Sequence, residues 1–189
     1  METDDDDDLL VRSARDPAAF EPLVERHAHA LHGYLTRRAP AVADDLLAEV
    51  WLQAYTSRTT FDATRGTART WLFGVTRNVL SAYWRRSAPE RSGAVGGDDH
   101  AVSDPWQAVD ERLDAAAVAP SIRRVMDQLP HAERELLLLV AWEQLTPTEA
   151  AAVIGIPAGT ARSRLHRARA RLREALEPAA ALPRTGELA

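Results

Sequence analysis

The sequence predicts an all-α protein in which two small helical domains are joined by a flexible linker. Apolar residues recur with the spacing of amphipathic helices over residues 9–88 and again over 121–177. Proline, glycine and acidic residues replace that pattern over residues 89–120, as in a linker. Near the end of the second stretch, a short capped helix, a glycine turn and a longer helix follow one another.

The composition excludes several classes of protein. The chain of 189 residues has no cysteine, so it has neither a disulfide framework nor a thiolate metal site. No apolar run is long enough to span a bilayer, and the chain does not begin with a basic and then apolar leader. We therefore expect a cytoplasmic protein without membrane insertion and without a cofactor.

Charge is unevenly distributed along the chain. The net charge is −5, yet all 23 basic residues are arginines, and most gather between Arg58 and Arg91 and between Arg162 and Arg173. The acidic residues gather over 4–8, 44–49 and 98–114. Because the local field decides where a phosphate backbone can bind, the negative total does not exclude nucleic acid as a partner.

The chain begins with an unbroken acidic run, Asp4 to Asp8. Such a run is typical of solvated, disordered termini, so residues 1–8 are expected to form an acidic disordered tail. A more specific hypothesis is that this tail shields the arginine clusters in the free protein. A short helix is expected to begin at Leu9.

A longer helix is predicted from Asp16 to about Arg38, because an aspartate cap precedes a proline at the first helical position. Three histidines fall within it, His27, His29 and His32. Only the second and third share a face, and neither has an evident carboxylate companion. We therefore expect no metal site there.

The next predicted helix, from Val42 to Ser57, carries an acidic outer face of Asp44, Asp45 and Glu49. Its apolar positions are expected to be buried, namely Leu46, Leu47, Val50, Trp51, Ala54 and Tyr55. Paired carboxylates can serve acid–base chemistry, but no nucleophile or third ligand accompanies them, so no catalytic residue is expected. The acids are better explained by the helix dipole or by a basic partner.

An ordered loop, Phe61 to Gly66, leads into a helix predicted from Thr67 to Arg86. On one side of this helix, cations alternate with an amide and aromatic rings: Arg69, Arg77, Asn78, Tyr83, Trp84, Arg85 and Arg86. Cations neutralise phosphates while aromatic rings stack on bases, at about 1–3 kcal/mol per base, so the pattern suits single-stranded nucleic acid. From this helix alone, a solvated arginine face above buried aromatics is an equal alternative.

After the linker, one helix is predicted from Ser121 to Leu129 and another from about Ala132 to Gln144. The second is expected to bury Leu136, Leu137, Val140 and Ala141. Residues 178–189 are expected to form a frayed tail.

Thr146-Pro147-Thr148-Glu149 has the pattern of a capping box, and Gly155 can end the short helix that it starts. A second helix is predicted from Ala158 to Leu176. Its apolar stripe is opposed by an outer face that contains Arg162, Ser163, His166 and Arg167. This is the arrangement of a helix-turn-helix, whose second helix enters the DNA major groove. The simpler alternative is a solvated amphipathic helix.

Both halves of the chain resemble the extracytoplasmic-function (ECF) sigma factors of the bacterial sigma-70 family. In the second half, the similarity to the family's region 4 includes Leu129-Pro130, Glu133 to Glu135, Glu149 to Ala151 and Gly159 to Arg169. In the first half, the similarity to region 2 is carried by Ala43 to Leu46, Glu49, Trp51, Phe61 to Gly66, Trp71-Leu72 and Arg77-Asn78.

The resemblance implies a transcription initiation factor rather than an enzyme. Such a factor binds core RNA polymerase, double-stranded promoter DNA and the melted minus-ten strand. Residues 9–88 would form a region 2 helical bundle and residues 121–177 a region 4 helix-turn-helix. A separate anti-sigma protein is a further partner that the family suggests.

The resemblance also implies roles for individual residues. Asp44, Asp45 and Glu49 would contact the polymerase. The minus-ten element would be held by Phe61, Arg65, Arg77, Asn78, Arg85 and Arg86. The minus-thirty-five element would be read by Thr160, Arg162, Ser163, His166 and Arg167.

Two rival functions remain open at this point. A helix-turn-helix regulator that works without polymerase explains residues 146–176, but it leaves the acidic face and the arginine-bearing helix without a role. A helical enzyme would need a converging set of nucleophile or metal ligands, which the sequence does not offer.

Overall fold

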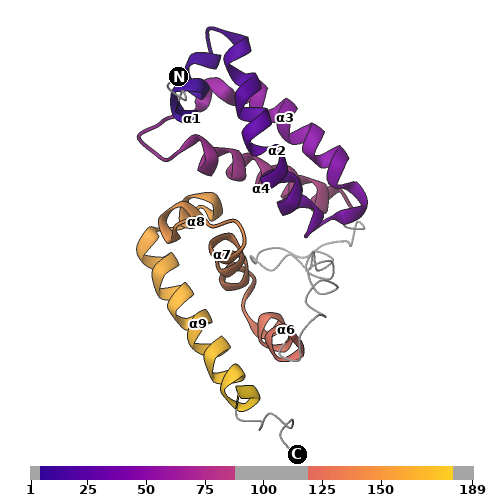
Figure 1. Cartoon of the computed structure of the whole chain (residues 1–189), viewed down its shortest axis with the longest axis vertical. Helices are drawn as coiled ribbons and strands as arrows, with labels where there is room; N and C mark the ends of the chain where they lie inside the picture. The colour runs from indigo at the N-terminus through magenta and orange to yellow at the C-terminus, as the bar shows by residue number, and fades with distance from the viewer. Residues whose placement is uncertain (1–4, 88–118, 181–189) are drawn as a thin grey trace, which may run out of the picture. The chain divides into compact units, whose positions relative to one another are not determined.

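The computed structural model describes residues 5–87 and 119–180, with side chains from 124 to 174 in the second range. Within these ranges every regular element is helical (Figure 1). The chain divides into two compact units, Met1–Val109 and Asp110–Ala189. The predicted all-α fold with two helical domains is confirmed, whereas the linker expected over residues 89–120 falls almost entirely outside the described residues.

Over its described residues, 5–87, the first unit contains four α-helices and three short 3-10 helices. The α-helices are α1 (Asp6–Ser13), α2 (Glu21–Thr36), α3 (Ala43–Ser57) and α4 (Ala68–Ser87). The 3-10 helices are η1 (Pro17–Phe20), η2 (Pro40–Val42) and η3 (Arg58–Thr60). Asp16 caps η1 as its sequence suggests, because its Oδ1 accepts a hydrogen bond of 3.1 Å from the Ala18 backbone N–H.

The core of the first unit lies between α2, α3 and α4, with α1 packed across α2 and α4 (Figure 1). Tyr34 and Phe73 meet edge to face at its centre, with ring centroids 5.7 Å apart. The same core contains the fully buried leucines of α1, α2 and α4, namely Leu9, Leu10, Leu23, Leu31, Leu35 and Leu72. Burial of this many large side chains stabilises the first unit.

The prediction for α3 is only partly right. Leu46, Val50 and Ala54 are buried, but Leu47 and Trp51 are half-buried and Tyr55 is exposed. Both rings contact Phe20 in edge-to-face geometry, with centroid distances of 5.4 Å for Tyr55 and 6.2 Å for Trp51, and the Arg58 guanidinium lies 3.9 Å from the centroid of the Tyr55 ring.

The prediction of a disordered tail over residues 1–8 is wrong for Asp6, Asp7 and Asp8, which form the first turn of α1. Acidic side chains are stabilising at a helix N-terminus because they oppose the positive end of the helix dipole. Leu9 and Leu10, which follow directly, have exposed fractions of 1% and 0%. Their burial fixes the acidic turn to the folded unit.

The second unit contains α6 (Ala119–Gln128), α7 (His131–Ala141), α8 (Pro147–Ile154) and α9 (Ala158–Ala180), with α9 packed against the other three (Figure 1). The predicted apolar stripe of α9 is confirmed at Ala161, Leu165 and Ala168, all buried. The backbone of α9 continues to Ala180, beyond the predicted end at Leu176.

The prediction for α7 is wrong in its end and in part of its buried face. The helix stops at Ala141 rather than Gln144, which has the left-handed φ of 55°. Leu136 is buried as predicted, and Leu138 and Leu139 are buried although neither was predicted to be. Leu137 and Val140 are half-buried, and Ala141 is exposed.

Candidate nucleic-acid interface

Helix α8, which precedes the turn into α9, is capped by hydrogen bonds at both of its ends. At its start, Thr146 and Glu149 exchange the two hydrogen bonds of a capping box, with the Thr146 N–H donating to Glu149 Oε2 at 2.8 Å and the Glu149 N–H donating to Thr146 Oγ1 at 3.2 Å. At its end, Gly155 has a φ of 81°. The Ile156 N–H donates to the Ala151 carbonyl at 3.0 Å, and the Gly155 N–H donates to the Ala152 carbonyl at 3.2 Å, which together make a Schellman motif.

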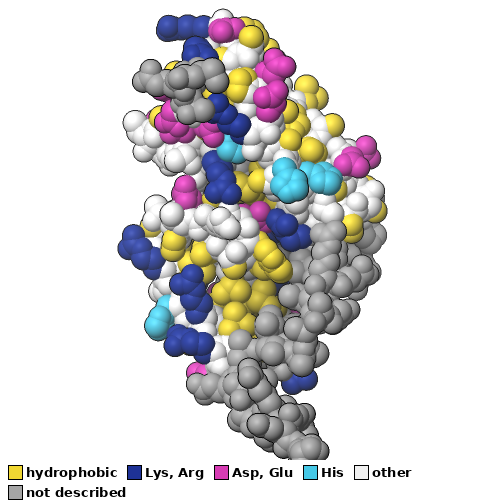
Figure 2. Space-filling model, viewed as in Figure 1, with side chains coloured by type: hydrophobic (Ala, Val, Ile, Leu, Met, Phe, Trp, Pro, Cys, Tyr) yellow, Lys and Arg dark blue, Asp and Glu magenta, His cyan; other side chains and the backbone are white. Residues whose placement is uncertain are grey.

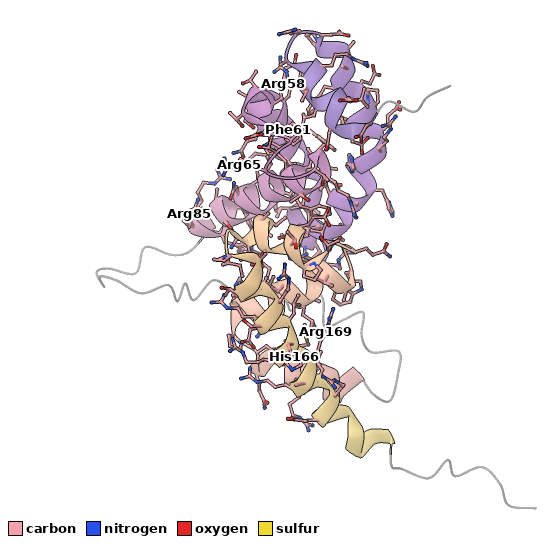
Figure 3. All side chains as sticks on the ribbon, turned by 90° about the vertical axis from the view of Figure 1, so that its left-hand side faces the viewer. Arg58, Phe61, Arg65, Arg85, His166 and Arg169 are labelled. Atoms are coloured by element: carbon pink, nitrogen blue, oxygen red, sulfur yellow. The ribbon has the colours of Figure 1, made fainter. Side chains whose placement is uncertain are left out.

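Opposite its buried stripe, α9 presents the residues predicted to read DNA. Arg162, Ser163, His166 and Arg167 are exposed and Thr160 is half-buried. The Ser163 hydroxyl donates to the Thr160 carbonyl at 2.9 Å. On the face drawn in Figure 2, arginine side chains and a histidine follow α9, and Figure 3 labels His166 and Arg169 on the same helix. An exposed helix of this kind fits the width of a DNA major groove.

A buried carboxylate on α7 holds the same helix, which the sequence did not predict. Glu133 is 6% exposed. Its Oε2 accepts a hydrogen bond of 3.0 Å from Arg171, and its Oε1 lies 3.6 Å from the guanidinium of Arg167. Arg167 therefore has one partner inside the unit while most of its side chain stays exposed.

In the first unit, the loop between η3 and α4 has an internal structure of its own. Asp62 Oδ1 accepts hydrogen bonds from the Thr64 N–H at 3.0 Å and from the Thr64 hydroxyl at 2.7 Å, which is an Asx turn. These two bonds hold the pKa of the Asp62 carboxyl below its ordinary value. Phe61 packs edge to face on Trp71 of α4 at 6.1 Å, whereas Arg65 is exposed. Figure 3 shows Phe61 and Arg65 beside this loop.

The remaining residues of the predicted minus-ten set are distributed along α4. Arg77 is half-buried, and Asn78, Arg85 and Arg86 are exposed. With a rise of about 1.5 Å per residue, Arg77 and Arg85 lie about 12 Å apart along the helix axis. The set therefore forms an extended surface, and near its end Tyr83 and Trp84 meet edge to face, with ring centroids 4.9 Å apart.

The predicted acidic set lies on α3. Asp44 and Asp45 occupy its first turn and are exposed, and Glu49 follows one turn later, half-buried. The Asp44 carboxylate lies 2.9 Å from His32 Nε2, so His32 does have the carboxylate companion that the sequence did not reveal. Within the described parts of the chain, no group of three or more His, Cys, Asp or Glu side chains could hold a metal ion.

Two of the predicted sets touch each other. Arg86 of the minus-ten set donates a hydrogen bond of 3.2 Å to Glu49 of the acidic set. Both side chains remain substantially exposed. The carboxylate and the guanidinium thus neutralise each other where the faces of α3 and α4 meet.

Leu52 extends the acidic face of α3 and was missed by the sequence analysis. Its exposed fraction is 70%, the largest among the large apolar side chains that the structure describes. Leu52 lies three residues after Glu49 and seven after Asp45, which places all three on one side of the helix. Leu52 does not follow the helical spacing of the buried residues Leu46, Val50 and Ala54. This departure is the sequence signal that could have identified it as exposed.

No helix in the described ranges is long and apolar enough to cross a membrane. Two family models match the chain, sigma-70 region 2 over residues 23–90 and sigma-70 region 4 over residues 120–172. These matches cover α2 to α4 in the first unit and α6 to α9 in the second.

Curated relatives match both units together. The chain is 32% identical to the ECF RNA polymerase sigma factor RpoE of Cereibacter sphaeroides, over 87% of this chain and 90% of that protein. It is 30% identical to the RNA polymerase sigma-H factor of Pseudomonas aeruginosa, over 94% of this chain and 97% of that protein.

Solved structures are similar as well. CnrH in complex with the cytosolic domain of CnrY matches with a TM-score of 0.61 and 26% identity, over 92% of this chain and 97% of that chain. The sigma factor RpoE of Bartonella quintana, in complex with the anti-sigma factor NepR, matches with a TM-score of 0.58 and 21% identity, over 84% of this chain and 96% of that chain. The second match supports the fold alone.

Proposed function

The chain belongs to the ECF sigma factors of the bacterial sigma-70 family, and from this premise we propose how its two units divide the work of transcription initiation. The protein binds core RNA polymerase and recognises promoter DNA, and it is not an enzyme. The observation that carries the proposal is that an exposed arginine face on α9 lies in one unit while an acidic face and an arginine-bearing helix lie in the other.

The second unit reads the minus-thirty-five element as a double strand. Thr160, Arg162, Ser163, His166 and Arg167 enter the major groove, where a bidentate arginine distinguishes guanine by about 1–3 kcal/mol. The capping box and the Schellman turn support this role because they fix the angle at which α9 leaves α8.

The first unit holds the melted minus-ten strand and promotes DNA opening. Phe61 and Arg65 on the loop capture a base turned out of the stack, while Arg77, Asn78, Arg85 and Arg86 follow the phosphate backbone. The Asx turn at Asp62 supports this role, since an ordered loop loses less conformational entropy on binding.

Asp44, Asp45 and Glu49 dock the first unit onto core polymerase. Their exposure on one helix favours a basic partner surface. Leu52 adds an apolar contact within the same face. We place this activity in the cytoplasm. We also expect a separate anti-sigma protein to bind the chain, because the similar sigma factor RpoE of Bartonella quintana was solved in complex with the anti-sigma factor NepR.

Run-off transcription from a library of linear genomic fragments tests the function directly. Core polymerase with this protein is expected to produce new, discrete start sites that share two short upstream elements. The control is core polymerase alone on the same library. Tight DNA binding without any new transcript would contradict the proposal.

The residue roles are tested on the strongest promoter from that experiment. Arg162→Ala is expected to relax recognition at one or two base pairs of the upstream element, whereas Arg77→Ala is expected to impair opening near the start site. Arg173→Ala is the matched control on α9, because Arg173 is exposed and lies three turns beyond Arg162. An equal loss on every upstream sequence from Arg162→Ala would mean that Arg162 contacts phosphate only.

A further inference from the structure

The loop that carries Phe61 and Arg65 is attached to α1 at both of its ends. Before the loop, Arg58 Nε donates a hydrogen bond of 3.0 Å to the Ser13 carbonyl at the end of α1. After the loop, the Ala68 N–H donates a hydrogen bond to Asp7 Oδ1 in the first turn of α1. One helix that is distant in sequence therefore fixes both ends of residues 61–67.

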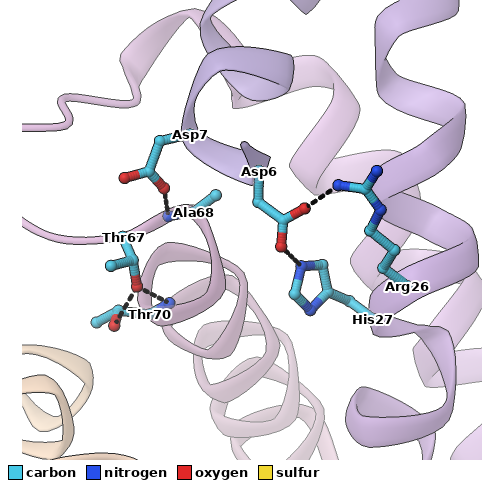
Figure 4. A network of polar contacts seen from close by, with 7 residues as sticks. All are labelled: Asp6, Asp7, Arg26, His27, Thr67, Ala68 and Thr70. Atoms are coloured by element: carbon cyan, nitrogen blue, oxygen red, sulfur yellow. Dashed lines mark hydrogen bonds and ion pairs between the residues drawn. The ribbon is translucent and has the colours of Figure 1, made fainter. Parts of the chain in front are cut away.

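Asp7 acts as a cap for a helix that is not its own. Ala68 is the first residue of α4, so its N–H has no acceptor within that helix (Figure 4). Thr67 caps another free amide of the first turn, since its Oγ1 accepts a hydrogen bond of 3.2 Å from the Thr70 N–H. A carboxylate at this position also opposes the positive end of the dipole of α4, which a hydroxyl cannot do.

The position of Asp7 is fixed because α1 is itself tightly held. Leu9 and Leu10 are fully buried, and the Ser13 hydroxyl donates to the Leu10 carbonyl at 2.6 Å. On the neighbouring residue, the Asp6 carboxylate lies 2.6 Å from Arg26 and 2.8 Å from His27 of α2 (Figure 4). The Asp7 contact thus belongs to a packed element rather than to a chain terminus in solution.

We propose that α1 is a positioning element for the loop of residues 61–67, and that Asp7 is the residue through which it sets the start of α4. The proposal rests on the function proposed above, in which this loop captures a base of the melted strand. Fixed loop ends reduce the entropy that is lost when the loop closes on its ligand. Asp7 touches no DNA in this scheme, and its effect is transmitted entirely through Ala68.

The test compares three variants of the full-length chain. Asp7→Ala removes the acceptor, whereas Asp7→Asn keeps an acceptor oxygen without the charge. Asp8→Ala is the matched control, because Asp8 lies in the same turn, is exposed and makes no side-chain hydrogen bond or ion pair with a described residue. Thermal unfolding is measured for each variant, and all assays are made at a temperature where every variant is folded.

Two readouts report on the loop. The first is hydrogen exchange of the backbone amides of residues 62–70 in the free chain, where Asp7→Ala is expected to raise the exchange rate at Ala68 about tenfold or more. The second is permanganate reactivity of the melted strand, on the strongest promoter from the run-off experiment, with core polymerase saturated by the variant. Asp7→Ala is expected to lower opening several-fold, Asp7→Asn to have an intermediate effect, and Asp8→Ala to match the unmodified chain.

Other outcomes overturn the proposal in distinguishable ways. If Asp7→Ala leaves exchange or opening unchanged while Phe61→Ala impairs opening, α1 does not position the loop, but the proposed function of the loop stands. If Asp7→Ala weakens core polymerase binding as much as opening, Asp7 has only a general structural role. If Phe61→Ala and Arg65→Ala both leave opening unchanged, the loop does not capture DNA, and the proposed function of the loop fails together with the inference.

Discussion

Asp6 connects α1 to α2 through two neighbouring basic residues, Arg26 and His27. Partial burial of its carboxyl acts to raise its pKa, but the hydrogen bonds and charges of Arg26 and His27 outweigh that effect. The pKa of Asp6 therefore lies below its ordinary value of 3.8. A carboxyl with a lowered pKa stabilises the folded state above the pKa that it has when unfolded, and this stabilisation is lost as the pH falls through the folded-state pKa.

Asp6→Asn is expected to lower the free energy of unfolding at pH 7 by about 1 kcal/mol, because hydrogen bonds to charged groups contribute more than neutral ones but are screened near the surface. Urea unfolding measured between pH 7 and pH 3 checks this. The difference between the two proteins should shrink as the pH falls below 3.8. Asp8→Asn is the control for the removal of one charge from the same turn, and a difference independent of pH would contradict the ion-pair explanation.

Gln144 has a strained backbone for a residue with a side chain, since its φ is 55°. Its side chain is exposed, whereas Leu145 directly after it is 2% exposed. The left-handed conformation costs roughly 1–2 kcal/mol for an L-residue with a Cβ, and glycine avoids this cost but loses more backbone entropy on folding.

Gln144→Gly is therefore expected to stabilise the chain by up to about 1 kcal/mol, because the relief of strain exceeds the added entropy loss. Thermal unfolding of the second unit measures the effect. Arg169→Gly is a contrasting variant, since Arg169 is exposed in the interior of α9, where glycine should destabilise. A lower melting temperature for Gln144→Gly would show that the side chain contributes more than the backbone strain.

At the scale of whole elements, α7 and α9 are joined by the carboxylate of Glu133. Two arginines one turn apart on α9, Arg167 and Arg171, share this group. Because Arg167 also belongs to the predicted DNA-reading set, Glu133 restricts the rotamers that this side chain can present to a promoter.

A double-mutant cycle with Glu133→Gln and Arg171→Gln is expected to give a coupling energy of about 1 kcal/mol, as for a partly buried ion pair with good geometry. Chemical unfolding of the single and double variants provides the four free energies. Pairing Glu133→Gln with Arg173→Gln is the control, since Arg173 is exposed and makes no ion pair with Glu133. A coupling energy near zero for Arg171 would mean that the contact contributes nothing measurable.

For the whole molecule, the net charge is −5, but each of the two helical segments carries a net positive charge. Residues 9–88 contain eleven arginines against seven acidic residues, and residues 121–177 contain nine against seven. Residues 1–8 contain six acidic residues and no arginine. The segments that are proposed to bind DNA are therefore positive, even though the full chain is acidic.

Separately produced segments 1–88 and 119–189 are each expected to fold into helices, because each holds its own buried core. Mixed together, they should initiate transcription at least about a hundredfold less well than the intact chain, because a covalent connection raises the effective concentration of one unit at its site once the other is bound. Circular dichroism tests whether each segment folds into helices, and run-off transcription tests how well the mixture initiates. If the mixture at micromolar concentration initiated as well as the intact chain, the expected effect of the covalent connection would be contradicted.

The sequence alone determined the features that depend on neighbouring residues. The helices of both units, the capping box at Thr146 and Glu149, the turn at Gly155 and the buried stripe of α9 all follow from periodicity and from interactions within a few residues. Prediction from the sequence failed where the local pattern does not favour one face of a helix over another. The run Leu136 to Leu139 is apolar on every side, so its periodicity could not select the buried face of α7.

Only the tertiary structure decided which distant groups meet. Asp7 caps a helix that begins 61 residues later, Glu133 reaches Arg171 across 38 residues, and Arg86 pairs with Glu49 across 37. Each contact depends on how whole helices pack, and packing is set by the summed burial of many apolar side chains rather than by the polar residues that come together. For this reason the acidic run at the N-terminus suggested a solvated tail from its composition, whereas the burial of Leu9 and Leu10 makes Asp6 and Asp7 part of the fold.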